Sequence, residues 1–224
     1  MMHQLADKKK FFFYLIIFLL ISSITSDYFI KLKNNKKIEI SVQGLDAKEN
    51  DLIKEKLKKI ENFELFKNRH DIQNIINSNE LVDEFEVKII YPNQINIQIK
   101  ETTLLAKTLV NNKIFVFGSN KKLIDEYKTE YNHLPTIFGK FDKDYFLDLL
   151  SELEKNQFNI NQIDSFFFFP SKRWDIKLKN SLLIKLPQKN WKNSIKNVLS
   201  ILNNAELNNF NVIDLRVNGK VFLK

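Results

Sequence analysis

The sequence predicts an α+β protein with a single N-terminal transmembrane helix, a βααββ domain, and a β-rich domain of antiparallel sheet with two packed helices. Three observations lead to this prediction: an uncharged N-terminal stretch, two short helical patterns between alternating strands, and a long strand-rich remainder with two further helical stripes. A chain of 224 residues with 44% hydrophobic content and 20 Phe has enough apolar material for packed cores.

The first predicted element is a transmembrane helix over residues 11–30, which follows a tail over residues 1–10. Residues 11–26 carry no charge, and at about 1.5 Å per residue the segment to Ile30 reaches about 30 Å, the thickness of the bilayer hydrocarbon. A cleaved signal peptide is the alternative, because small residues follow a short apolar run, but no A-x-A cleavage site is present.

Lysines flank both ends of this segment, so charge bias alone does not decide its orientation. The short tail before it and the long chain after it resemble a start-transfer anchor with the large part exported. We therefore expect a single-pass type II protein with a cytoplasmic N-terminus.

A linker over residues 31–37 leads to the first exported domain, predicted over residues 38–102. Asp46 and Glu49 form a capping box at the start of its first helix. Pro92-Asn93 is a turn dipeptide between its last two strands. The predicted order is a strand over residues 38–42, a helix carrying Leu52, Ile53, Leu57 and Ile60, a helix from Asn68 that buries Ile72, Ile75 and Ile76, and strands over residues 82–91 and 94–101.

The second domain, predicted over residues 103–224, alternates strands with two amphipathic helices. The four consecutive Phe from Phe166 to Phe169 are interpreted as a strand buried on both faces. Strands are predicted over residues 104–110, 113–117, 163–169, 173–179, 181–187 and 212–217, and helices over residues 142–155 (Phe146, Leu149, Leu150, Leu153) and 188–203 (Trp191, Ile195, Val198, Leu199, Leu202).

The residues of catalytic and metal chemistry are sparse. The chain has no Cys, three widely separated His and four Gly, with no HExxH, phosphate-loop or G-x-S-x-G pattern. We predict no enzymatic activity, no cofactor, no metal and no small-molecule substrate. The net charge of +8 is spread along the chain and mixed with 27 acidic residues, which argues against a nucleic-acid partner.

The last predicted strand is interpreted as a sheet edge that accepts a partner strand. Ile213, Leu215 and Val217 alternate with polar residues, and Asn218-Gly219 then offers a two-residue turn. The predicted partner-binding residues are Asp214, Leu215, Arg216, Val217, Asn218, Gly219, Lys220, Val221, Phe222 and Leu223.

Arg216 and Arg173 are two of only three Arg in a chain whose other 32 basic residues are Lys. Arg216 either offers its planar fork to a partner or pairs with Asp214 on the same strand, and the sequence leaves both open. Arg173 is expected to stack on the neighbouring Trp174.

Several segments, in order along the chain, carry a family resemblance. The first domain has Val42-Gln43-Gly44, then Val82 and Val87, then YPNQINIQIKE over residues 91–101 followed by Ala106; the second has HLPTIFG over residues 133–139, RWDIKLKNSLLIKLP over residues 173–187 and VIDLR over residues 212–216. On these segments the chain resembles the FtsQ/DivIB family of bacterial cell division proteins over residues 11–224, and its first domain is similar to a POTRA domain. The chain departs from the family pattern in three places: Leu104 replaces a Pro, the Asp-x-x-Gly turn reads GSNK over residues 118–121, and Ser181 replaces a Gly.

The resemblance implies a non-catalytic, bitopic scaffold of the bacterial divisome that recruits and links division proteins at the septum. It implies a cell inner membrane protein with most of its chain periplasmic, which binds an FtsB/FtsL-like partner through its last strands. FtsK, FtsW and FtsI are further implied partners, and residues 11–30 would contact the lipid bilayer. The alternatives are an exported periplasmic enzyme and a basic domain that binds nucleic acid or a membrane surface.

Overall fold

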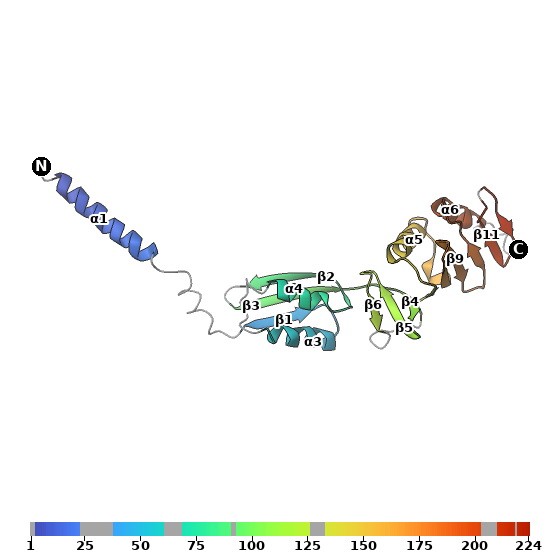
Figure 1. The fold of residues 1–224 in the computed structure, drawn as a ribbon, viewed down its shortest axis with the longest axis horizontal. Helices are drawn as coiled ribbons and strands as arrows, with labels where there is room; N and C mark the ends of the chain where they lie inside the picture. Colours follow the sequence, from blue (N-terminus) through green and yellow to red (C-terminus); the bar gives the residue numbers. More distant parts are fainter. Residues whose placement is uncertain are drawn as a thin grey trace.

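The computed structural model describes residues 3–22, 38–60, 69–90, 93–125, 133–202, 210–217 and 219–224. After an N-terminal helix, the chain forms a three-stranded sheet with two helices and then a nine-stranded sheet with two more (Figure 1). The mixed α and β architecture confirms the predicted fold class.

Helix α1 spans His3–Ser22, so it begins eight residues before the predicted transmembrane segment. Residues 23–30 of that segment and the predicted linker over residues 31–37 lie outside the described residues. Among the described residues, no helix has the length and apolar character needed to cross a membrane.

The first domain contains a sheet of strand order β1-β3-β2, in which β1 is parallel to β3 and β2 is antiparallel to it. Its core joins the sheet to both helices through residues such as Ile53, Leu57, Ile76 and Ile97, each at most 2% exposed. The elements are β1 Glu39–Gln43, α3 Ala47–Lys58, α4 Arg69–Asn77, β2 Val82–Ile90 and β3 Gln94–Glu101.

The predicted capping box forms only in part. Asp46 caps α3 by accepting the backbone N–H of Glu49 at 2.8 Å. The carboxylate of Glu49 instead accepts the side-chain amide of Asn79 at 2.7 Å. The buried Glu49 thereby ties α3 to the segment that follows α4.

The second domain contains a sheet of strand order β12-β11-β10-β9-β8-β7-β4-β5-β6. The predicted antiparallel sheet is wrong in this respect, because β4·β7, β7·β8 and β10·β11 are parallel pairs. Helix α5 lies between β7 and β8 in the chain, and α6 lies between β10 and β11. Each helix brings the chain back so that the two strands beside it run in the same direction, and the sheet is therefore mixed. The elements are β4 Leu104–Val110, β5 Lys113–Gly118, β6 Leu123–Asp125, β7 Thr136–Phe138, α5 Lys143–Lys155, the short 3₁₀ helix Ile160–Gln162, β8 Ile163–Phe169, β9 Arg173–Leu178, β10 Leu183–Lys185, α6 Trp191–Leu202, β11 Val212–Asp214 and β12 Phe222–Leu223.

One row of side chains crosses this sheet beneath the two helices. The strand registers align Ile137, Phe166, Ile176, Ile184 and Ile213, each at most 2% exposed. They pack against the apolar faces of α5 and α6. We call the opposite face of the sheet the open face. Because successive side chains along a strand point to opposite faces, the open face carries the residues directly before and after each member of this row.

The Phe166–Phe169 strand is not buried on both faces as predicted. Phe166 is fully buried beneath the helices, whereas Phe167 and Phe169 are only half-buried on the open face. The stretch is therefore core on one side only.

The turn between β5 and β6 fastens the second domain to the first. The side-chain amide of Asn120 donates to the backbone oxygens of Glu80 and Val82, both at 2.8 Å. The Lys122 ammonium donates to the oxygens of Asn77 and Asn79, at 2.7 and 2.9 Å, at the C-terminal end of α4. We call this contact region the junction.

An apolar cluster lies beside these hydrogen bonds. Leu81 of the first domain packs with Val116 and Ile124 of the second, and these three side chains are at most 2% exposed. Polar and apolar contacts together make the junction part of the folded core.

Candidate functional site

Strand β12 lies at one end of the nine-stranded sheet and covers β11, which lies between β10 and β12. Phe222 and Leu223 pair with Asp214 and Ile213. The turn before β12 is closed by a bond of 3.1 Å from the N–H of Lys220 to the oxygen of Val217. The outer side of β12, rather than of β11, is thus the sheet edge.

The ladder fixes which backbone groups of this edge face outward. Val212 and Lys224 exchange two hydrogen bonds, both of 3.0 Å, so Phe222 is the next residue to bond inward to β11. The N–H and C=O of Val221 and Leu223 then point away from β11. These groups are placed to bond an added strand.

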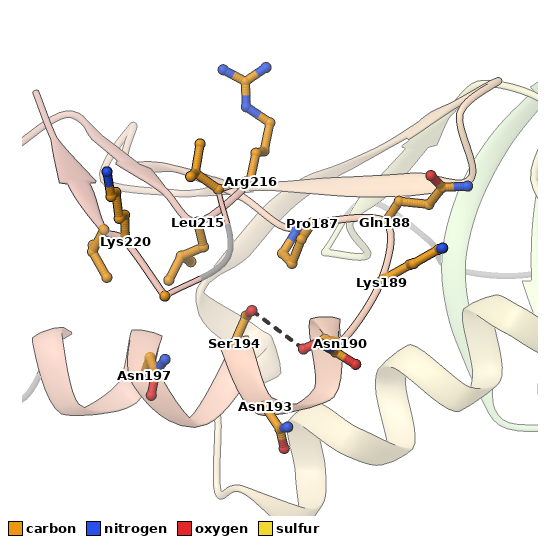
Figure 2. Close-up of a pocket in the computed structure, with 13 residues that line it drawn as sticks. Pro187, Gln188, Lys189, Asn190, Asn193, Ser194, Asn197, Leu215, Arg216 and Lys220 are labelled. Carbon is orange, nitrogen blue, oxygen red and sulfur yellow. Dashed lines mark hydrogen bonds between the residues drawn. The ribbon is translucent and has the colours of Figure 1, made fainter.

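A groove of about 510 Å³ runs beside this edge on the side of α6. It lies between the loop before α6, the polar face of that helix and the β11–β12 turn (Figure 2). Its lining is mostly polar or basic: Gln188, Lys189, Asn190, Asn193, Ser194, Asn197 and Lys220, with Pro187, Leu215 and Val221 among the others. Within it, Ser194 Oγ donates to the oxygen of Asn190 at 3.5 Å.

Arg216 and Asp214 form a bidentate pair on the open face. Arg216 Nε lies 2.9 and 3.0 Å from the two Asp214 oxygens, and Nη2 lies 2.6 Å from Oδ2. These hydrogen bonds from Arg216 lower the pKa of Asp214 to about 2. Arg216 is one of the residues that line the groove, and in Figure 2 its guanidinium points away from α6.

Arg173 does not stack on Trp174 as predicted. Its guanidinium carbon lies 4.2 Å from the centroid of the Phe169 ring, and its Nε lies 3.2 Å from Asp175 Oδ1. Burial raises the pKa of Asp175, and the charge and hydrogen bond of Arg173 oppose that rise. Arg173 has the structural role that was expected, with different partners.

The structure separates nine of the ten predicted partner-binding residues into two groups. Asp214 and Leu215 are buried, at 9% and 4% exposure, so they support the edge from within. Asn218 lies outside the described residues. The others are exposed or half-buried on the turn and β12: Arg216, Val217, Gly219, Lys220, Val221, Phe222 and Leu223.

The sequence interpretation did not include the residues that α6 contributes to the groove. Asn193 and Asn197 lie opposite the apolar stripe of that helix, and the polar face was itself the available signal. Within the part of the chain that the structure describes, no group of three His, Cys, Asp or Glu is placed to hold a metal ion.

Comparison with known proteins finds similarity to cell division proteins. The sequence model of the family "Cell division protein FtsQ/DivIB, C-terminal" matches residues 106–216, which end at Arg216, just before the β11–β12 turn. The chain is 28% identical over 159 residues to the cell division protein FtsQ of Rickettsia bellii, covering 70% of this chain and 60% of the relative. It is 28% identical over 156 residues to FtsQ of Rickettsia conorii, covering 69% and 58%.

A solved structure is also similar, the major extracytoplasmic domain of the cell division protein DivIB from Geobacillus stearothermophilus. The identity is 13% and the TM-score 0.32, over 49% of this chain and 98% of that one. The matched stretches span at most 60% of the length of the two FtsQ relatives. With the family match over the second domain and the two FtsQ relatives in agreement, the chain belongs to the FtsQ/DivIB family of cell division proteins.

Proposed function

We propose that this chain is a non-catalytic scaffold of the bacterial divisome that binds an FtsB/FtsL-like partner by strand addition at β12. The observation that carries the proposal is the outward-facing backbone of Val221 and Leu223 at a sheet edge. Main-chain hydrogen bonds would supply affinity, and alternate side chains of the added strand would supply specificity.

The surroundings of the edge support this mode of binding. Val217, Val221 and Phe222 are 49%, 41% and 45% exposed, so apolar surface is available beside the backbone groups. Side chains of an added strand point alternately to the two faces of the sheet. On one face they would meet the groove beside α6, and on the other they would meet the Arg216 guanidinium.

The proposal includes a membrane anchor over residues 11–30, an inner-membrane location and a periplasmic position for both domains. The uncharged run over residues 11–26 supports it. FtsK, FtsW and FtsI are further proposed partners, and the septum is the proposed site of action. A fluorescent fusion of the full chain should be enriched at midcell during constriction, and uniform fluorescence around the cell would contradict the septal role.

The experiment on the edge is Val221→Pro in the full chain. Proline removes the outward N–H of Val221 and leaves the inward bonds of Phe222 and Lys224 in place. We expect retention of the FtsB/FtsL-like pair in a pull-down to fall at least tenfold, while the thermal melt followed by circular dichroism stays unchanged.

Val221→Thr is the matched control, because it keeps the N–H and a β-branched side chain. It should retain the partner as wild type does. Undiminished binding by Val221→Pro would show that the partner docks elsewhere.

A further inference from the structure

The open face carries an exposed apolar row at the other half of the sheet from β12. Leu109 pairs with Ile114 across β4 and β5, and Phe138 pairs with Phe167 across β7 and β8. The parallel register of β4 and β7, Thr108 with Ile137, places Leu109 beside Phe138. We call Ile114, Leu109, Phe138 and Phe167 the apolar strip.

The strip is a continuous surface that the described residues leave uncovered. Ile114, Leu109 and Phe138 are 39%, 59% and 47% exposed. The rings of Phe138 and Phe167 stack with centroids 5.1 Å apart and planes 13° apart. Exposed contiguous apolar surface of this kind marks an interaction site.

The charges around the strip are mostly positive. Lys107 lies two residues before Leu109 on the same face of β4, and Lys140 follows Phe138 by two residues in the sequence. No acidic residue lies within two residues of a strip member in the sequence. Lys107 and Lys177 flank Thr136 and Ser165 in the next row on the open face.

Two carboxylates lie near the strip, and each has a partner. Asp175, which pairs in register with Phe167, is bonded to Arg173 at 3.2 Å. Asp164 accepts the hydroxyl of Ser165 at 2.7 Å. The surface therefore combines apolar side chains with a net positive border.

We propose that the apolar strip binds an acidic amphipathic helix of a partner protein. Neighbouring strands lie about 4.8 Å apart, close to the pitch of about 5.4 Å that separates successive turns of a helix. A helix laid across the four strands would place one apolar side chain over each strip residue in about three turns. Acidic residues beside its apolar stripe would meet the lysines.

A second copy of this chain fits the surface poorly, because two strips brought face to face would bring their lysine borders together. The inference does not depend on strand addition at β12, which lies five strands away from β7 in the sheet.

The test uses the full chain in a neutral detergent and two fluorescent peptides of 14 residues. Both are helical with leucines on one face; one carries glutamates beside the leucines and the other carries lysines at the same positions. Fluorescence anisotropy should show the glutamate peptide binding at least tenfold more tightly than the lysine peptide. The Leu109→Ser, Phe138→Ser double variant should bind the glutamate peptide at least tenfold more weakly than wild type. Lys177→Glu should bind it about threefold more weakly.

Ile90→Ser is the matched control, because Ile90 is 45% exposed on β2 of the first domain. It should bind the glutamate peptide as wild type does, and so should Val221→Pro, which separates this surface from the β12 edge.

Four results would overturn the proposal. The first is equal binding of the two peptides, and the second is full binding of the glutamate peptide by the Leu109→Ser, Phe138→Ser variant. The third is self-association of the chain, measured by sedimentation velocity, that this double variant abolishes. The fourth is tighter binding to short-chain phosphatidylglycerol than to the glutamate peptide, which would identify a membrane surface as the occupant.

Discussion

The two ends of the nine-stranded sheet have opposite surroundings. At the β6 end, Ile124 and the neighbouring Val116 are fully buried against Leu81 of the first domain. At the β12 end, Val221 and Phe222 are 41% and 45% exposed. One end is built into the molecule, and the other presents backbone and apolar side chains to solvent.

Under the proposed function, the two ends of this one sheet have different roles. Hydrogen bonds from Asn120 and Lys122 to carbonyls of the first domain join the two domains at the β6 end, where a partner strand would have to compete with the fold. At the β12 end, a strand can add without displacing any contact between the domains. We call the β6 end the locked end and the β12 end the free end; under the proposed function, the free end accepts the partner strand.

The largest expected effect comes from breaking the locked end. Leu81→Ala removes a side chain that is 2% exposed and leaves a cavity between the domains. We expect the free energy of unfolding in urea to fall by about 2 to 4 kcal/mol. Because the lost contact joins the domains, the urea unfolding curve should also change from one transition to two resolved transitions, one for each domain.

The matched control is Leu52→Ala on α3, where the side chain is 41% exposed. It should change the free energy of unfolding by less than about 0.5 kcal/mol. Equal effects of the two substitutions would mean that the junction does not couple the domains.

A smaller effect is expected at the free end, where the Arg216–Asp214 pair stabilises the segment before the turn. Because the folded pKa of Asp214 is about 2 and an unfolded Asp titrates near about 3.9, the pair stabilises the fold above about pH 4. That contribution is lost as the pH falls through 2. Asp214→Asn should cost about 1 kcal/mol at pH 7, since Arg216 is exposed to solvent, and the difference from wild type should shrink below pH 4.

Carboxyl NMR titration checks the same point directly and uses Asp175 as an internal control. Asp175 also has an arginine neighbour, but its pKa is raised because burial outweighs the single contact with Arg173. The two carboxyls should therefore shift in opposite directions from the usual value. A titration midpoint for Asp214 near 4 would show that the Arg216–Asp214 pair does not stabilise the free end.

Long periodic segments of this fold were predictable, and short or long-range features were not. The stripe of Trp191, Ile195 and Val198 predicted α6 because helical spacing records a buried face. Strands β6 and β7 have three residues each, too few to show a period of two, and were not predicted as strands. Parallel pairing between β7 and β8 was also missed, because register depends on contacts between distant segments.

The candidate site was predictable to a similar degree. Alternation and the Asn218-Gly219 turn predicted a strand and its return, but β11 ends at Asp214 and the edge belongs to β12. The sequence could not show that Asp214 and Leu215 are buried, because burial depends on the distant segments that the fold places beside them, such as Lys185 of β10, whose oxygen accepts the N–H of Leu215. Asn120 is an ordinary turn residue in sequence, and only the tertiary structure reveals its bonds to the first domain.

The smallest expected effects concern two exposed turns in the half of the sheet nearest β12. Ser181, which stands where the family pattern has Gly, has a φ of +73°, and Gly219 has a φ of +71°. A left-handed backbone costs a residue with a side chain about 1 kcal/mol or more, whereas Gly adopts it freely but loses more entropy on folding. Ser181→Gly should therefore raise the free energy of unfolding by less than about 1 kcal/mol.

Gly219→Ala is the reciprocal substitution and should lower the free energy of unfolding by about 1 kcal/mol. An added Cβ at Gly219 would meet no atom within 4 Å, so the effect comes from backbone conformation alone. Urea unfolding of both variants measures the pair. Changes of the same sign would show that contacts, and not the left-handed backbone, determine the stability of these turns, and that the β12 end is less free than its exposure indicates.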